Sequence, residues 1–306
     1  MEMIMSTGLD SPIAVATDFS PASEHALVEA MAIARQQGVG IHLIHVLARL
    51  ESDDETEEFK ALDRAIQAAA HNQLEKLHAK FDGQGVVISQ SLIDGFVPEA
   101  LGKTAIELGC GLVVMATHGR SGLRRFLLGS IAEKVARDCT LDLLISRGSR
   151  PTHGYERLMV PTDFSPPAEV ALKRAVEMAA PNATIDLIHT WQFPTPVTHQ
   201  YAPLGSHTAA LDRISMSIRE QAEAQGAELI SRYQRKGISI TFTSINGSPA
   251  PTIIERANDC DLIAMGTHGR HGFKRLMLGS IAEKTIRHAP CSVLTTHAET
   301  NHAETH

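Results

Sequence analysis

A long internal repeat constrains this chain more than any other feature. Residues 117–134 read THGRSGLRRFLLGSIAEK and residues 267–284 read THGRHGFKRLMLGSIAEK, with 13 of 18 positions identical at an offset of 150. A shorter match, Thr-Asp-Phe-Ser-Pro, stands at 17–21 and again at 162–166, an offset of 145. Matches of this length indicate a duplication. The 306 residues are therefore expected to form two copies of one domain, each of ordinary domain size.

The same two matches place the boundaries. We predict a first domain over residues 1–148, a second over 149–306 and a linker over 147–155. The offset grows by five residues between the two matches. The proline-rich stretch 191–206 is the expected place for that insertion, because prolines favour loops over helices and central strands.

Short runs rich in Val, Ile and Leu alternate with longer amphipathic segments in both copies, which predicts βα units around a parallel sheet. The runs of the first copy are 12–17, 40–47, 86–92, 112–116 and 141–146, and those of the second are 157–161, 184–190, 238–245, 262–266 and 291–296. The first helix of each copy should begin at an N-cap serine, Ser20 or Ser165, with proline at the first helical position. The sequence thus predicts two tandem Rossmann-like α/β domains, each a five-stranded, doubly wound parallel sheet with helices on both faces. Ligands of such sheets bind at the carboxyl ends of the strands.

Charge and composition exclude several classes of partner. A net charge of -7 argues against a general nucleic-acid binder, and no apolar run is long enough to cross a bilayer. The first residues, MEMIMSTGLDSP, lack the pattern of a secretory signal, so we expect a cytoplasmic location. The four cysteines show no Cys-x-x-Cys spacing and are interpreted as small buried hydrophobes.

A glycine-rich loop follows the fourth predicted strand of the second copy. It reads Gly266-x2-Gly269-x9-Gly279-Ser280 and leads into a helical segment over 281–288. Glycines let another group approach the main chain closely, and a helix N-terminus offers unpaired N–H groups with a partial positive charge. Basic side chains stand between the glycines in both copies, at Arg270, Lys274 and Arg275 and at Arg120, Arg124 and Arg125. This combination predicts a phosphate site.

A second interpretation of these segments stays open. Ser130-x-x-Glu133 and Ser280-x-x-Glu283 have the spacing of a capping box, in which serine and glutamate satisfy the N–H groups at a helix start. A capping box needs only these two residues and leaves the glycines and the basic residues unexplained. The combination, and not the serines alone, favours phosphate binding.

The spacing Gly-x2-Gly-x9-Gly-Ser after a strand resembles the ATP-binding signature of the universal stress protein family. The Thr-Asp-Phe-Ser sequences extend the resemblance over nearly the whole chain. It implies an adenine nucleotide, ATP or else ADP or AMP, with Mg²⁺ accompanying ATP. It also implies that Asp163 contacts the ribose hydroxyls and that backbone groups of the glycine loop contact the phosphates. The implied site of the second copy is Pro161, Thr162, Asp163, Thr190, Met265, Gly266, His268, Gly269, Arg270, Gly279, Ser280 and Ile281.

The first copy departs from this pattern at one glycine and reads Ala116-x2-Gly119-x9-Gly129-Ser130. A methyl group would weaken binding if the backbone approaches the ligand there or adopts a positive φ, whereas an alanine with ordinary φ would be tolerated. We therefore expect the better site in the second copy. The weaker candidate site consists of Thr17, Asp18, Val46, Ala116, Gly119, Arg120, Gly129, Ser130 and Ile131.

Individual positions carry alternatives as well. The resemblance places the adenine-lining position on Val46 and Thr190, of which valine suits a base better. Asp18 and Asp163 have a structural alternative, in which they only turn the chain into the following helix.

Signatures of catalysis and of metal binding are absent from the sequence. It contains no Walker A motif and no dinucleotide Gly-x-Gly-x-x-Gly after the first strand, and no catalytic base can be named. The sixteen histidines show no paired ligand spacing, so no metal site is predicted. The expected function is a nucleotide-binding regulator of a stress response. A dimerisation scaffold without nucleotide and a slow ATPase remain the alternatives.

The resemblance also carries an expectation about assembly. Single-domain members of the family pair through their last strands, which implies that 141–146 lies against 291–296 within this one chain. Two tandem chains are expected to form a homodimer, and an unidentified regulatory protein is the expected partner.

Overall fold

The computed structural model describes residues 9–48, 56–117, 128–148, 151, 153–192, 208–267 and 278–297. Its strands form one ten-stranded sheet in the order β3-β2-β1-β4-β5-β10-β9-β6-β7-β8. The first repeat contributes β1 Ile13–Ala16, β2 Ile41–Leu47, β3 Ile88–Asp94, β4 Leu112–Ala116 and β5 Asp142–Ser146. The second contributes β6 Tyr155–Thr162, β7 Ala179–Trp191, β8 Ser239–Asn246, β9 Leu262–Gly266 and β10 Ser292–Thr296. The predicted strands are thus present in both repeats.

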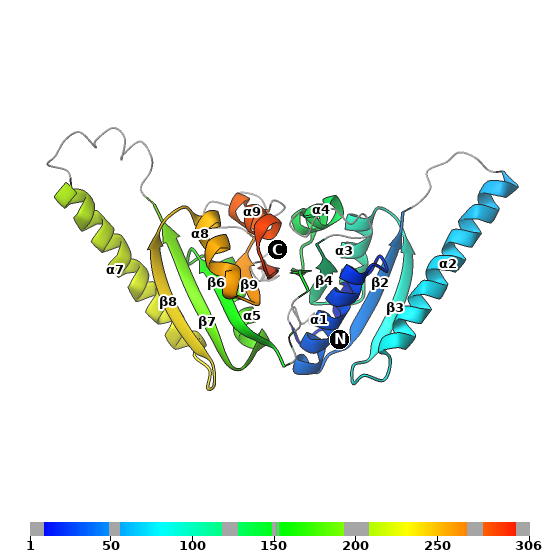
Figure 1. Cartoon of the computed structure of the whole chain (residues 1–306), viewed down its shortest axis with the longest axis horizontal. Coiled ribbons are helices and arrows are strands. Elements are labelled where there is room, and N and C mark those ends of the chain that lie inside the picture. Colours follow the sequence, from blue (N-terminus) through cyan, green and yellow to red (C-terminus); the bar gives the residue numbers. More distant parts are fainter. Residues whose placement is uncertain are drawn as a thin grey trace, which may run out of the picture.

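The two repeats meet at β5 and β10, the pair in the middle of the sheet. Neighbouring strands within each repeat are parallel. β5 and β10 run antiparallel, with Ile145 opposite Val293 and Leu144 opposite Leu294. The two halves of the molecule lie on either side of this junction (Figure 1). The expectation that the last strands pair is confirmed, and each strand covers what would otherwise be an exposed edge of the other repeat.

Helices cover both faces of the sheet. Their bounds are α1 Pro21–Gln37, α2 Glu57–Phe81, α3 Val97–Glu107, α4 Ser130–Asp138, α5 Pro166–Met178, α7 Thr208–Tyr233, α8 Pro249–Arg256 and α9 Ser280–His288, with a 3-10 turn at Ala257–Asp259. Residues of α1, α2, α5 and α7 pack into one core cluster, and residues of α3, α4, α8 and α9 pack into the other. The sheet is therefore the middle of three layers. Among the described helices none has the length and apolar character needed to cross a membrane.

The strands are apolar throughout because both of their faces are buried. In β4, Leu112 and Val114 belong to one core cluster, and Val113 and Met115 belong to the other. Residues of a strand alternate between faces, so a central strand with helices on both sides needs an apolar residue at every position. This explains why the sequence shows short continuous apolar runs.

The largest departure from the predicted strand bounds is in β7. The prediction for the second strand of the second repeat, 184–190, is too short, because β7 already begins at Ala179. The preceding helix α5 ends at Met178. Pro181 explains this early end, because the residue before a proline is driven out of the helical conformation and toward the extended one.

Candidate functional site

A tight turn follows β1 and leads into α1. Thr17 Oγ1 accepts a hydrogen bond from the backbone N–H of Phe19 at 3.0 Å, and Asp18 Oδ1 accepts one from the N–H of Ser20 at 3.0 Å. These are bonds from a side chain to the backbone two residues on, which fix the reversal of the chain. The turn thereby sets the place of the Asp18 carboxylate.

The same turn recurs after β6. Thr162 Oγ1 accepts a hydrogen bond from the N–H of Phe164 at 3.0 Å, and Asp163 Oδ1 accepts one from the N–H of Ser165 at 3.1 Å. Both aspartates therefore take part in turning the chain into the helix. A turn role and a contact to a ribose do not exclude each other, because a carboxylate oxygen can accept more than one hydrogen bond.

The phenylalanine of each turn has a left-handed backbone, with φ of 63° at Phe19 and 60° at Phe164. A bulky residue adopts this conformation only where its surroundings hold it, and such positions concentrate at functional sites. A histidine from the neighbouring strand supports each turn. The His45 ring lies 4.3 Å from the Phe19 ring, and its Nδ1 donates a hydrogen bond to the carbonyl of Thr17 at 2.7 Å.

His189 repeats this arrangement in the second repeat. Its ring lies 4.8 Å from that of Phe164, and its Nδ1 donates to the carbonyl of Thr162 at 2.9 Å. Because a carbonyl oxygen only accepts, the proton of each neutral ring sits on Nδ1. This role was not predicted from the sequence, although the recurrence of His45 at position 189 was a usable signal.

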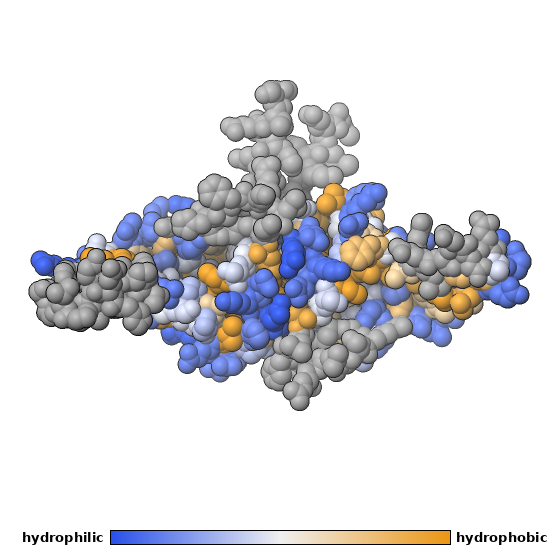
Figure 2. Space-filling view, turned by 90° about the horizontal axis from the view of Figure 1, so that it is seen from above, coloured by the Kyte–Doolittle hydropathy of each residue, from blue (hydrophilic) through white to orange (hydrophobic). Residues whose placement is uncertain are grey.

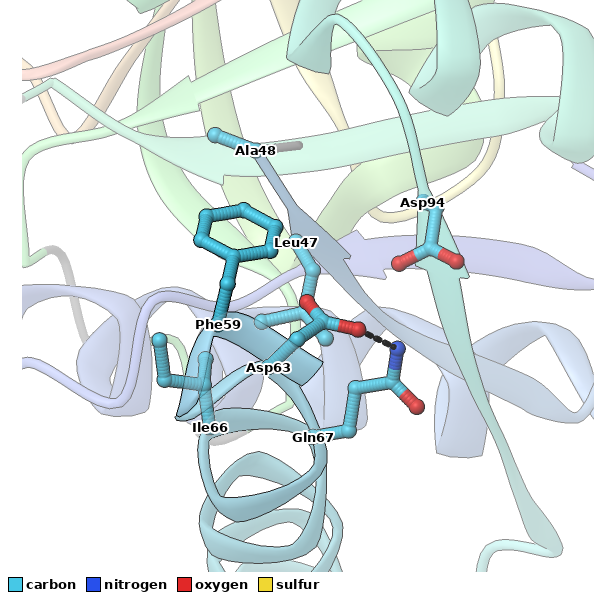
Figure 3. A pocket seen from close by; sticks show the side chains of 7 residues that line it. All are labelled: Leu47, Ala48, Phe59, Asp63, Ile66, Gln67 and Asp94. Carbon is cyan, nitrogen blue, oxygen red and sulfur yellow. Dashed lines mark hydrogen bonds between the residues drawn. The ribbon is translucent and has the colours of Figure 1, made fainter. Parts of the chain in front are cut away.

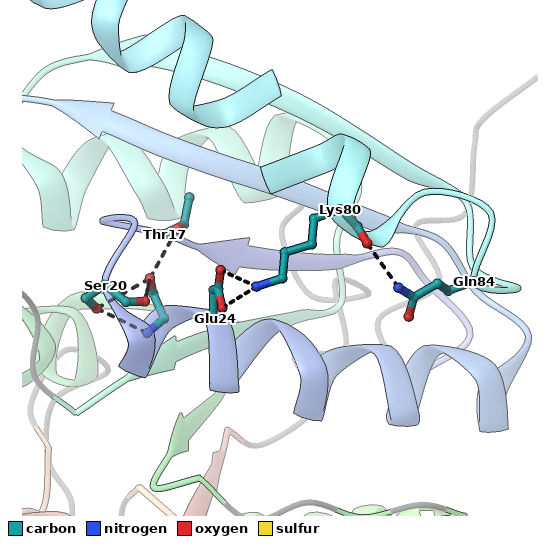
Figure 4. A network of polar contacts seen from close by, with 6 residues as sticks. Thr17, Ser20, Glu24, Lys80 and Gln84 are labelled. Carbon is teal, nitrogen blue, oxygen red and sulfur yellow. Dashed lines mark hydrogen bonds and ion pairs between the residues drawn. The ribbon is translucent and has the colours of Figure 1, made fainter. Parts of the chain in front are cut away.

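The helices that follow the two turns start differently. Ser20 is the N-cap of α1, and its Oγ accepts a hydrogen bond from the N–H of Ser23 at 3.2 Å (Figure 4). This confirms the prediction for the first repeat. Ser165 occupies the N-cap position of α5 without a capping bond, and its Oγ donates to Asp163 Oδ1 at 2.5 Å instead. Ala168 stands where the first repeat has Ser23, so the second helix lacks the hydroxyl that Ser23 places beside Ser20.

Glycines cap the helices α4 and α9. The N-caps are Gly129 and Gly279, no side chain makes a capping hydrogen bond to either helix, and Ser130 and Ser280 are the first helical residues. The capping-box interpretation is wrong, because each serine stands one position too late to serve as the N-cap. Helix starts without a side-chain cap are suited to an anion, whose oxygens accept from the N–H groups there.

Backbone contacts fix where these helices begin. The N–H of Gly129 donates to the carbonyl of Thr117 at 2.7 Å, and the N–H of Gly279 donates to that of Thr267 at 2.8 Å. A Cβ at Gly279 would lie 2.8 Å from the same carbonyl oxygen. This glycine is therefore required for a close approach of two backbone segments, at an ordinary φ of -64°.

A cavity of about 390 Å³ lies among these elements in the first repeat. Its walls are mainly apolar, which suits a flat organic base with a few polar groups around it. Seven of the predicted residues line it: Thr17, Asp18, Val46, Ala116, Gly129, Ser130 and Ile131. The other two, Gly119 and Arg120, lie outside the described residues.

The second repeat places its predicted residues at the corresponding positions. Pro161 and Thr162 end β6, Thr190 lies at the penultimate position of β7, and Met265 and Gly266 end β9. Asp163 follows β6, and Gly279, Ser280 and Ile281 start α9. His268, Gly269 and Arg270 lie outside the described residues. The described members of the set therefore come from the carboxyl ends of three strands and the start of one helix.

Gly266 has a packing role that the sequence analysis did not foresee. A Cβ at this position would lie 2.8 Å from Cβ of Pro167 and 2.9 Å from its carbonyl carbon. Glycine is thus needed where α5 crosses the end of β9. In the first repeat Ala22 replaces Pro167, and the methyl group of Ala116 stands at the wall of the cavity. The cavity is therefore present in the first repeat with alanine at this position.

A second cavity, of about 520 Å³, adjoins the first, with Ala48 lining both. It lies between α2 and the ends of β2 and β3, and Figure 3 shows its lining residues Leu47, Ala48, Phe59, Asp63, Ile66, Gln67 and Asp94.

Figure 2 shows the molecule from above, on the side where β2 and β7 end in Figure 1. The described surface there mixes small hydrophobic patches with hydrophilic residues.

Comparison with known proteins agrees with this architecture. The universal stress protein family matches residues 11–147 and again 154–297. Universal stress protein MT2052 of Mycobacterium tuberculosis is 24% identical, with 92% of this chain and 93% of that protein covered. Universal stress protein MJ0531 of Methanocaldococcus jannaschii is 30% identical over 46% of this chain and 81% of its own length.

Solved structures of similar fold cover both repeats. The crystal structure of a universal stress protein from Archaeoglobus fulgidus superposes with a TM-score of 0.63 at 19% identity, covering 94% of this chain and 98% of that one. A putative universal stress protein from Pseudomonas aeruginosa gives a TM-score of 0.62 at 16% identity, with 96% and 94% covered. The chain therefore belongs to the universal stress protein family, with one family domain in each of its two repeats.

Proposed function

We propose that this chain is a regulatory protein that binds an adenine nucleotide, ATP or a related ADP or AMP, without turning it over. The observation that carries the proposal is the cavity of about 390 Å³ in the first repeat. There the Asp18 carboxylate, the apolar side chain of Val46 and the glycine-capped start of α4 line one space. A ribose, a base and a phosphate chain need these three kinds of surface.

Each part of the ligand has a proposed contact. The base lies against Val46 in the first repeat and Thr190 in the second, and the ribose hydroxyls donate to Asp18 or Asp163. The phosphates accept from the backbone at the starts of α4 and α9. Mg²⁺ accompanies ATP and is held chiefly by the phosphates, as is usual for this ion.

The second repeat is proposed as the better site because it carries the complete glycine pattern from Gly266 to Gly279. The first repeat is proposed as a weaker site. Its cavity supports occupancy, since the Ala116 methyl group lines the wall and leaves about 390 Å³ open. The number of nucleotides bound per chain then shows whether one repeat or both repeats are occupied.

The regulatory role rests on what the site contains. Asp18 and Asp163 each have an oxygen engaged in a turn, and His45, which also lines the cavity, holds the turn through its bond to the Thr17 carbonyl, so we assign these groups to shaping the site and not to catalysis. We further propose that the protein acts in the cytoplasm, that two chains associate, and that a partner protein senses the bound nucleotide.

The first test is to purify the protein without added nucleotide, denature it and identify any released small molecule by mass spectrometry. Titration of the emptied protein with ATP and Mg²⁺ follows. A single adenine nucleotide per chain supports one working site, and two support both repeats. If nothing is released and nothing binds, the nucleotide proposal is wrong and the scaffold alternative stands.

Asparagine variants then locate the sites. Asp163→Asn and Asp18→Asn remove the charge but keep an amide oxygen for the turn, so the fold should be retained. In the titration with ATP and Mg²⁺, we expect Asp163→Asn to abolish the tighter binding event and Asp18→Asn to abolish the weaker one. Asp82→Asn, at the exposed end of α2, is the matched control and should bind normally. Unchanged binding in both site variants would refute the assignment.

A further inference from the structure

Two buried ionisable side chains, an acid in the first repeat and a base in the second, occupy equivalent positions. Glu29 in α1 and Arg174 in α5 are related by the same offset of 145 that relates the Thr-Asp-Phe-Ser-Pro sequences. Glu29 is 0% exposed and Arg174 is 4% exposed. Charged residues are almost never buried so completely unless they have partners. Their partners lie at the junction between the repeats.

Arg174 contacts Asp142, the first residue of β5, which belongs to the other repeat. Its Nε donates to Asp142 Oδ2 at 2.8 Å, and its Nη1 donates to Glu177 Oε2 at 2.9 Å. The side chains of Arg174 and Asp142 are 5% and 10% exposed. Burial lowers the pKa of Arg174, but Asp142 and Glu177 outweigh it and hold the pKa above its ordinary value. The guanidinium is therefore charged and paired across the junction.

Glu29 contacts the equivalent end of the junction. Its carboxyl accepts from Ser146 Oγ at 2.5 Å and from the Tyr155 hydroxyl at 2.7 Å, and it is also hydrogen-bonded to Ser292. Ser292 begins β10 as Asp142 begins β5, and the two positions are related by the offset of 150. An acid in the first repeat thus faces a serine, whereas a base in the second repeat faces an acid.

We propose that these four positions, Glu29, Asp142, Arg174 and Ser292, make each repeat accept the other repeat and reject a second copy of itself. In a pair of two first repeats, Glu29 would face Asp142 at both ends of the junction. In a pair of two second repeats, Arg174 would face Ser292 at both ends. The pair of first repeats is disfavoured because two carboxyl groups would be buried together. The pair of second repeats is disfavoured because each Arg174 would lose its partner across the junction.

A neighbouring ion pair at the junction would not distinguish mixed pairs of repeats from like pairs, and it therefore provides a control. Arg287 Nη2 in α9 lies 3.2 Å from Glu133 Oε2 in α4. Each repeat carries both a glutamate and an arginine at these positions, because Glu283 and Arg137 are the equivalents. This pair would form in any combination of repeats, so its removal should not change which repeats associate.

The test uses the full chain with a protease site placed in the linker between β5 and β6. The protein is cleaved after folding, unfolded in urea, refolded, and its half-chain pairs are counted by native mass spectrometry. We expect mixed pairs in an excess of about 100-fold or more over like pairs. This ratio corresponds to the free energy lost when a buried charge loses its ion-pair partner. Like pairs in statistical proportion would overturn the proposal.

Two variants sharpen this result. Asp142→Ser gives the first repeat the serine that Glu29 already accepts, so pairs of two first repeats should now appear. Glu133→Gln should leave the mixed excess unchanged. If Asp142→Ser yields only mixed pairs in the same excess, the four positions do not select the partner.

A measurement on the uncleaved chain does not depend on refolding of the halves. Arg174→Glu places a carboxylate against Asp142 and should lower the thermal midpoint strongly. Adding Asp142→Ser to Arg174→Glu recreates the arrangement of Glu29 with Ser292 and should restore much of the loss. A double variant no more stable than Arg174→Glu alone would contradict the proposal.

Discussion

Replacement of Glu29 by glutamine should remove a pH dependence from the stability of this protein. Burial raises the pKa of the Glu29 carboxyl from its ordinary 4.5 to about 7, although hydrogen bonds from Ser146, Tyr155 and Ser292 oppose the shift. The folded state therefore binds a proton more tightly than the unfolded state does. The stability gained from this proton is fully present below pH 4.5 and is lost as the pH rises through about 7.

The size of the effect follows from the shift. At 1.36 kcal/mol per pKa unit, a rise from 4.5 to about 7 corresponds to about 3 kcal/mol of unfolding free energy. Glu29→Gln keeps the shape of the side chain and stays neutral at every pH. Relative to the wild type, the variant should gain about 3 kcal/mol of stability between about pH 4.5 and about pH 8.5.

Urea unfolding followed by circular dichroism, at constant ionic strength across this pH range, measures the difference between the two proteins. Glu133→Gln is the control, because Glu133 is partly exposed and pairs with Arg287 near the surface of the junction. A constant difference between wild type and Glu29→Gln across the range would show that the carboxyl is not held neutral by burial and would refute the reasoning.

Three further substitutions test the local geometry. Gly266→Ala should destabilise the protein by about 1–3 kcal/mol, because its Cβ would crowd Pro167, and thermal unfolding measures this; an unchanged midpoint would mean that α5 moves freely. Ser20→Ala should cost about 1 kcal/mol by removing the capping bond to Ser23, whereas Ser165→Ala should cost less, because Ser165 makes no capping bond. Equal losses in the two serine variants would contradict the difference seen between the helix starts.

The repeat and the apolar runs were enough to predict two five-stranded α/β domains, and the family resemblance supplied the pairing of their last strands. The early start of β7 was missed although Pro181, which disfavours helical backbone just before it, stands in the sequence. The capping box was indistinguishable in sequence from a glycine-capped helix, since both contain Ser130 and Glu133 at the same spacing.

The candidate site was predictable to the extent that motifs mark it. Asp18, Val46 and Ser130 come from distant parts of the chain and line one cavity, as the family resemblance implied. The recurrence of His45 at position 189 marked a shared role, but the sequence could not say which one, because that role depends on a contact to the Thr17 carbonyl and on the left-handed backbone of Phe19.

The antiparallel pairing of β5 with β10 joins the repeats more deeply than a linker does. Both core clusters run through this junction, with Leu144 and Leu294 in one and Ile145 and Val293 in the other. Each repeat thus completes the hydrophobic core of its neighbour. A gene that lost either half would encode a last strand, β5 or β10, without its pairing strand. It would also encode a buried ionisable group, Glu29 or Arg174, without its contact across the junction, so the two repeats form one structural unit.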